Sequence, residues 1–311
     1  MKKEVINWLL EGPTWIRYAT QLQLLNTKPD LPPVLRDDSI IRIVQRLKSN
    51  QVGIPALRTR RISCEQAANA YWDLFFLADI GLTANDLKLK QEMEEIFNLQ
   101  SPDGTFITEA VMEPDYFCVS AILLSSVAKM GYLDDPRLLN YIQVILDSQS
   151  LNGGWHCGQD YTVGHALQDQ TSCPMDNLNV LMLLGQYEEY RKDLKMNGAI
   201  DLLLKHWEKK DEKWRVDGFG IGRRFKSLQY PAVKYGILRV LDVLSLFPCT
   251  IESPSFLSML DSVHQKSSNG KYFAEPSVAS YAEFDFGQNK EPSRWITFLV
   301  NRIEKRVTEC K

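Results

Sequence analysis

Apolar residues recur every three or four positions along most of the chain, which is the spacing of amphipathic helices. The runs end at glycine, proline or asparagine, and no segment has the strict alternation of a half-buried strand. Pro136, Pro174 and Pro231 stand where a first helical turn accepts proline, and Gly81 and Gly131 stand where helices should end. The pattern predicts an all-α fold.

The predicted helices are of two kinds. Residues 115–130 and 173–185 are apolar nearly all round, which is typical of helices buried on every side. Residues 84–99 and 192–208 carry charges along one face, as helices at a surface do. We therefore expect an inner layer of apolar helices and an outer layer of amphipathic ones.

A short segment repeats along the chain. Gln100–Phe106 reads QSPDGTF, Gln149–Trp155 reads QSLNGGW, and a looser copy begins at Gln265. The alternation of helix types around these loops predicts a single domain, 1–311, that forms an α/α toroid of about six helical hairpins with inner and outer helix rings. An open helical solenoid is the alternative. The expected pairs cover 14–48, 65–99, 115–149, 173–208 and 230–265, with a last helix near 292–307 that could pair with the N-terminal one.

The Gln-x-x-(Asp/Asn)-Gly-x-(Trp/Phe) loops resemble the repeat of the squalene/hopene cyclase and protein prenyltransferase superfamily. The resemblance covers most of the chain and implies the α/α toroid of that superfamily. It also implies that Gln100 and Gln149 cap helix ends, and that Phe106 and Trp155 pack on the next inner helix. The wider pattern is similar to small bacterial toroid proteins described only as related to prenyltransferases or squalene cyclases.

The catalytic motifs of the superfamily are absent from the sequence. A class II cyclase uses an Asp-x-Asp-Asp run, but the only adjacent aspartates are Asp37-Asp38 and Asp134-Asp135, at positions expected for helix caps. No Asp-Asp-x-x-Asp cluster for magnesium occurs. Cys173 falls where prenyltransferases open an inner helix with a zinc-binding Asp-x-Cys pair, but residue 171 is Thr and the last helix has no His.

A different cluster offers metal ligands. Cys157, His165 and Cys173 supply two thiols and an imidazole, which suit zinc. Asp176 lies one turn beyond Cys173 and is the candidate catalytic acid, because burial raises the pKa of a carboxyl. The alternative is that both cysteines are small buried hydrophobes and His165 is a loop residue.

Basic and aromatic residues could bind a ligand. Arginines before the inner helices at 65–80 and 230–246 could hold a diphosphate or carboxylate head group, and aromatic faces could line a hydrocarbon pocket and stabilise a carbocation. The predicted ligand-binding residues are Tyr71, Trp72, Tyr116, Arg223, Arg224, Tyr230, Tyr235, Arg294 and Trp295. The alternatives are solvated arginines, and aromatic rings that pack between the two helix layers.

Composition limits the partners. The formal net charge of −3 gives no basic field that would hold nucleic acid or an anionic bilayer. No apolar run reaches the roughly 18 residues needed to cross a bilayer, and the first residues lack the apolar core of a signal peptide. We expect a soluble, cytoplasmic protein.

Three functions follow from these features. The leading expectation is a terpenoid cyclase-like or prenyltransferase-like protein that acts on or binds an isoprenoid-like apolar ligand. The second is a non-enzymatic ligand-binding or protein-interaction module, which a centre packed solid by Trp72, Phe76 and Tyr235 would favour. The third is a zinc-dependent thiol or prenyl transferase.

Overall fold

The computed structural model describes residues 2–60, 62, 66–106, 117–155, 173–211, 220–231, 235–276, 278–288 and 290–310. These residues form helices and irregular segments, with isolated β-bridges in place of strands. The prediction of an all-α fold is confirmed over this part of the chain. The α-helices are α1 (Lys3–Leu10), α2 (Thr14–Ala19), α3 (Pro32–Leu35), α4 (Asp38–Leu47), α5 (Ala70–Ile80), α6 (Ala84–Leu87), α7 (Lys90–Phe97), α8 (Phe117–Val127), α9 (Pro136–Asp147), α10 (Pro174–Leu184), α11 (Glu188–Arg191), α12 (Asn197–Glu208), α13 (Ile237–Leu244), α14 (Pro254–His264) and α15 (Arg294–Glu309).

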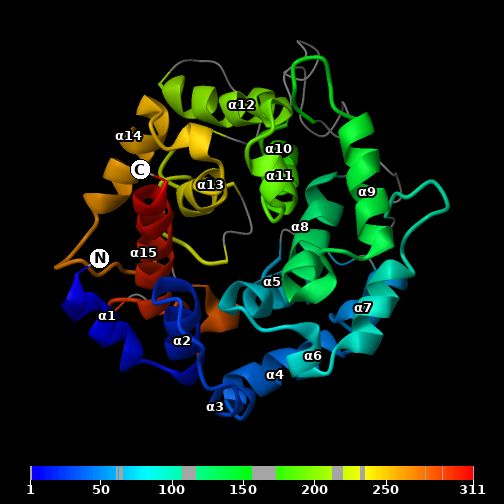
Figure 1. The fold of residues 1–311 in the computed structure, drawn as a ribbon. Helices are drawn as coiled ribbons and strands as arrows, with labels where there is room; N and C mark the ends of the chain where they lie inside the picture. The colour runs from blue at the N-terminus through cyan, green and yellow to red at the C-terminus, as the bar shows by residue number, and fades with distance from the viewer. Residues whose placement is uncertain are drawn as a thin grey trace.

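The helices are arranged in two layers around a common centre (Figure 1). Helices α5, α8, α10, α13 and α15 lie toward the centre, and α4, α7, α9, α12 and α14 surround them. The π-helical segments η1 (Thr20–Leu24) and η3 (Ala128–Tyr132) extend α2 and α8. Neighbouring contacts run from α2 to α5, α8, α10, α13 and α15, and from α15 back to α2. The contacts of the inner helices therefore form a closed circuit.

Burial separates the two layers as their composition requires. Every residue of α5 is buried, and α10 is buried except at Met175. In α4, by contrast, the buried residues are Ile40, Ile43 and Leu47, spaced three and four apart along one face. The apolar segments 115–130 and 173–185 contain α8 with the start of η3, and α10, and their described residues are nearly all buried.

One predicted helix start is wrong. Pro136 and Pro174 do stand in the first turn of α9 and α10. Pro231 does not open a helix, because α13 begins at Ile237 after an extended Gly236 with φ −153° and ψ 152°. The Ile237 amide donates to the Phe225 carbonyl at 2.8 Å, which fixes the chain direction just where the helix begins.

The repeated glutamines make equivalent hydrogen bonds. The Gln100 amide donates to a carbonyl of its own loop at 3.0 Å and to the Arg137 carbonyl at the start of α9 at 2.9 Å. The Gln149 amide donates to its own loop and to the Lys195 carbonyl just before α12, both at 2.8 Å. Each glutamine thus joins its loop to the next outer helix instead of capping the helix before it, which corrects the role expected from the resemblance.

The loop aromatic residue is fixed to the next inner helix. The Trp155 carbonyl accepts from the Cys173 amide at 3.2 Å, directly before α10. The Asn177 side chain accepts from the Trp155 amide at 3.1 Å and donates to the Cys173 carbonyl at 2.7 Å. Trp155 is fully buried and donates from Nε1 to the Ile145 carbonyl at 2.8 Å. The expectation that Trp155 packs on the following inner helix is confirmed.

The looser copy of the repeat, which begins at Gln265, is joined to the inner helix that follows it by equivalent hydrogen bonds. The Ser293 amide, directly before α15, donates to the Tyr272 carbonyl at 2.8 Å. The Thr297 hydroxyl accepts from the Tyr272 amide at 3.0 Å and donates to the Ser293 carbonyl at 2.7 Å. A polar side chain four residues after the N-cap therefore closes both junctions, although the residue types differ.

Candidate functional site

The predicted zinc and acid site is only partly within the described residues. Cys157 and His165 lie in 156–172, outside those residues. Cys173 is the buried N-cap of α10, and Asp176 is fully buried in its first turn. Over the described residues no group of three or more His, Cys, Asp and Glu side chains is placed to hold a metal ion.

The predicted ligand-binding aromatic residues lie inside the protein. Tyr71, Trp72 and Trp295 are fully buried, and Tyr230 and Tyr235 nearly so. Tyr116 lies in 107–116, outside the described residues. The five described rings are therefore covered by other side chains of the fold.

Trp295 belongs to a packed aromatic cluster. Its ring stacks on Phe298 with centroids 4.8 Å apart and meets Trp15 and Phe76 edge-on at 5.4 and 5.7 Å. The 278–288 segment adds further rings, including Phe286, which lies 5.0 Å from Tyr230. Aromatic rings from α2, α5, α15 and this segment thus fill one part of the interior.

Arg239 lies among the inner helices. It extends from α13 with its guanidinium carbon 5.2 Å from the centroid of Trp72 on α5. It also donates a hydrogen bond to Asn179 on α10 and contacts the sulfur atoms of Met175 and Met182 at 3.9 and 3.8 Å. Aromatic faces and amide oxygens are groups that stabilise a cation, and here they surround the protein's own guanidinium.

The predicted arginines have other surroundings. Arg223 and Arg224 are exposed. Arg294 packs against α1, with its guanidinium carbon 4.5 Å from the Trp8 centroid and its Nε donating to the Trp8 carbonyl at 3.1 Å. Lys271 lies on the same ring at 4.3 Å, so Trp8 holds the first helix to the last. The structure does not bring these arginines together with the aromatic residues.

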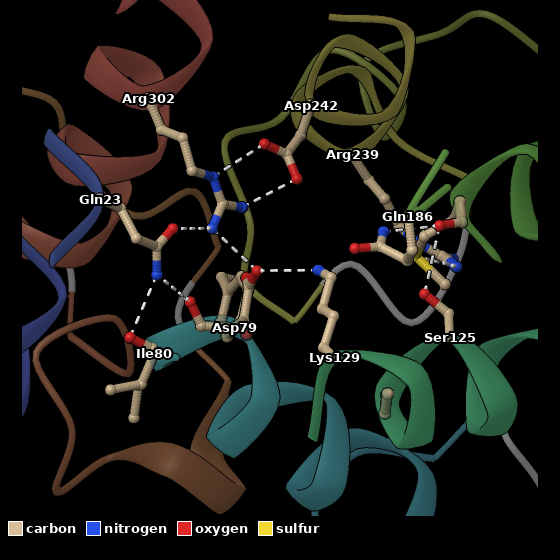
Figure 2. Close-up of polar contacts among 12 residues, drawn as sticks. Gln23, Asp79, Ile80, Ser125, Lys129, Gln186, Arg239, Asp242 and Arg302 are labelled. Carbon is tan, nitrogen blue, oxygen red and sulfur yellow. Dashed lines mark hydrogen bonds and ion pairs between the residues drawn. The ribbon is translucent and has the colours of Figure 1, made fainter. Parts of the chain in front are cut away.

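A buried charged network joins the C-terminal halves of the inner helices (Figure 2). Arg302 of α15 donates to Asp79 of α5 at 2.8 Å and to both carboxylate oxygens of Asp242 of α13 at 3.0 and 2.8 Å. Lys129 of η3 lies 3.4 Å from Asp79, and the Gln23 amide donates to the Asp79 carbonyl at 2.7 Å. The network therefore links η1, α5, η3, α13 and α15.

The charges in the network shift each other's protonation. Burial opposes ionisation of Asp242, but the charges of Arg302 and Arg306 together outweigh this effect and lower the pKa of Asp242 to about 2. Burial lowers the pKa of Lys129, with Asp79 acting against that shift. Burial, followed by the nearby Asp79 charge, raises the pKa of Tyr230, whose hydroxyl lies 3.3 Å from that carboxylate. The network therefore keeps Asp242 ionised at neutral pH and Tyr230 as a neutral donor.

One cavity beside this network is small. A cavity lined by Phe75, Asp79, Tyr230, Arg239 and Arg302, among others, has a volume of about 20 Å³. That volume holds about one water molecule, whereas small-molecule pockets usually measure some 300–1,000 Å³. The described residues thus leave no room for an isoprenoid chain at this point.

The sequence places four aspartates on otherwise apolar helices, Asp73, Asp79, Asp176 and Asp242, and we expect three of the four to pair with Lys, Arg or a helix terminus. Asp79 and Asp242 pair with Arg302, and Asp73 pairs with Arg46 at 2.5 Å. Sequence analysis missed Arg302, because the charges of α15 follow the pattern of an exposed helix face. The available signal was the aspartates themselves, since each buried carboxylate requires a cation.

A scan of the chain against models of known protein families finds no match, and a search of the curated proteins finds none. No helix in the described part of the chain is long and apolar enough to span a membrane.

Proposed function

We propose that the protein is an α/α toroid of about six helical hairpins, a relative of the terpenoid cyclases and prenyltransferases, and that it binds a ligand or partner without converting an isoprenoid. The fold assignment is supported by the closed circuit of inner-helix contacts. It is also supported by the equivalent hydrogen bonds of Gln100 and Gln149.

The observation that carries the binding function is the position of Arg239. Its guanidinium lies against Trp72, where a cyclase would need free aromatic surface for a substrate carbocation. Trp72, Phe76 and Tyr235 are all buried. The burial of these three rings supports a protein that does not cyclise an isoprenoid.

The test is an assay for turnover. Purified protein is incubated with farnesyl diphosphate, geranylgeranyl diphosphate or squalene, with magnesium and zinc present, and products are sought by mass spectrometry. We expect no cyclised or transferred product above a protein-free control. Product that forms with the wild type and disappears in Asp176→Asn would overturn the proposal.

A second candidate is zinc-dependent thiol or prenyl transfer, with Asp176 as an alternative acid. The observation in its favour is that Cys173 and Asp176 are both buried at the start of α10. Zinc held by Cys157, His165 and Cys173 would lower the pKa of a bound thiol or water. Elemental analysis of protein purified without chelators decides it: about one zinc per chain, lost in Cys173→Ser, supports the site, whereas metal-free folded protein removes it.

A further inference from the structure

A second, larger pocket adjoins the charged network. It has a volume of about 470 Å³, within the range of small-molecule sites, and is formed by η1, the segment around α11, the end of α13 and α15. Arg302 lines both this pocket and the small cavity. The buried network is therefore one wall of the larger pocket.

Positive charge dominates the lining. Its basic side chains outnumber its acidic ones, which are Glu188 and Glu309. These two carboxylates are 84% and 56% exposed and make only long contacts with Lys192 and Lys305, at 3.5 and 3.6 Å. Such exposed pairs neutralise little charge. The basic lining residues are Arg191, Lys192, Arg302, Lys305 and Arg306.

The deeper arginines are crowded. Arg302 and Arg306 share one carboxylate, that of Asp242, and Arg306 Nη1 also donates to the Ser245 hydroxyl at 3.0 Å. Burial lowers the pKa of Arg306; the Asp242 and Asp79 charges act against that shift, and the positive charges of Arg302 and Arg191 add to it. An anion bound between these side chains would relieve that repulsion.

Some of these basic side chains bind carbonyl groups at the ends of helices. The C-terminal ends of helices attract cations, and Arg191 Nε donates to the Gly185 carbonyl at 2.7 Å while Lys305 donates to the Gln23 carbonyl at 2.7 Å. These bonds use one donor of each side chain. A guanidinium has five N–H donors, so Arg191 retains donors for a ligand.

We propose that this pocket binds the phosphate group of a small phosphorylated molecule, held by Arg191, Lys192 and Arg306. Guanidinium groups match the oxygen geometry of phosphate, and the Ser245 hydroxyl lies beside them. This inference rests on the proposed function as a binding protein, and names the site and the chemical class of its ligand.

Titration calorimetry with inorganic diphosphate and with orthophosphate, at constant ionic strength, tests the site. Loss of a charge-assisted hydrogen bond weakens binding by about tenfold or more, so Arg191→Gln and Lys192→Gln should each raise the Kd by at least about tenfold. Arg36→Gln removes an exposed arginine outside the pocket lining and should leave the Kd unchanged. Circular dichroism confirms that each variant is folded.

Sedimentation with phosphatidic acid vesicles separates the sources of the phosphate. Free diphosphate binding that weakens in Arg191→Gln supports a soluble ligand. Vesicle binding that weakens in Arg191→Gln, without binding of free diphosphate, supports a lipid head group. Equal binding by wild type and Arg191→Gln, or no binding of either probe, overturns the proposal that this pocket binds phosphate. Turnover of a prenyl substrate alongside normal diphosphate binding would overturn the proposed function alone.

Discussion

Arg302 on α15 and Asp79 on α5 are paired at 2.8 Å although they lie 223 positions apart in the chain. Their side chains are 5% and 1% exposed, so water contributes little to the solvation of either charge. The pair holds helices from the two ends of the sequence beside one another. Because both side chains are almost fully buried, removal of one partner leaves the other charge buried without compensation.

Arg302→Met should therefore destabilise the protein by about 3–5 kcal/mol. The loss is measured as the change in the free energy of unfolding in urea. Arg42→Met is the matched control, because Arg42 pairs with Glu283 at 2.9 Å where both side chains are about half exposed. The control substitution should lower the free energy of unfolding by less than about 1 kcal/mol. Equal losses in the two variants would contradict a buried role for Arg302.

Asp242 should make the protein sensitive to acid. Its pKa is lowered from 3.8 to about 2 in the folded state, so its contribution is present above the unfolded pKa. That contribution is about 2 kcal/mol and is lost as the pH falls from about 4 to about 2. Urea midpoints measured over this range should fall more steeply for the wild type than for Asp242→Asn. Parallel curves would show that Asp242 is not paired in the folded protein.

His264 should have the opposite dependence. It lies 2.9 Å from Glu304 of α15, and this contact raises its pKa above 6.5 despite partial burial. The pair stabilises the fold below the unfolded pKa, and the effect is lost as the pH rises through the folded one. Both side chains are partly exposed, so the loss is below about 1 kcal/mol. The Tm should fall slightly between about pH 6 and pH 8 in the wild type, and this step should be absent in His264→Gln.

Asn177 should be important for attaching the loop at Trp155 to α10. Asn177→Ala removes its hydrogen bonds to the amide and carbonyl of Trp155 and to the Cys173 carbonyl. Buried groups left unpaired cost about 1–3 kcal/mol each, so we expect a loss of at least about 2 kcal/mol in urea denaturation. Thr297→Val tests the equivalent junction at Tyr272 and should act in the same direction. An unchanged midpoint in both variants would contradict the shared role.

A methyl group added at Gly198 should destabilise the protein. It lies in α12, where alanine normally stabilises a helix by about 1 kcal/mol relative to glycine. A Cβ there would lie 2.6 Å from both the Asn152 carbonyl oxygen and the Gly153 Cα, which are backbone atoms and cannot move independently. Gly198→Ala should therefore lower stability by about 1–3 kcal/mol. Gly220→Ala, with open space around the glycine, should change it by less than about 0.5 kcal/mol.

The inner helices could be predicted because their composition differs from that of a surface helix. Segment 173–185 is apolar nearly all round, and α10 is buried except at Met175. The start of α13 could not be predicted from Pro231, since the Ile237 amide that begins the helix donates to the Phe225 carbonyl, twelve positions earlier in the chain. Local sequence carries no signal for such a contact.

The buried network shows a second limit. Asp79 and Asp242 stand out because they interrupt apolar helices. Arg302 and Arg306 follow the pattern of solvated residues, and the packing of α15 against α13 and η1 covers Arg302 and partly covers Arg306. Arg239 likewise reads as a break in an apolar run, and its contact with Trp72 depends on helices far apart in the chain.

The closed circuit of inner-helix contacts affects how the protein comes apart. In a linear array of helical repeats, each end unit has one neighbour and frays first. Here α15 contacts both α13 and α2, and Trp8 is held between Lys271 and Arg294. Because each inner helix has a neighbour on both sides, opening any one of them exposes two interfaces at once. The first and last helices of the circuit, α2 and α15, are thus each held on two sides, and neither is a free end from which the inner helices could fray.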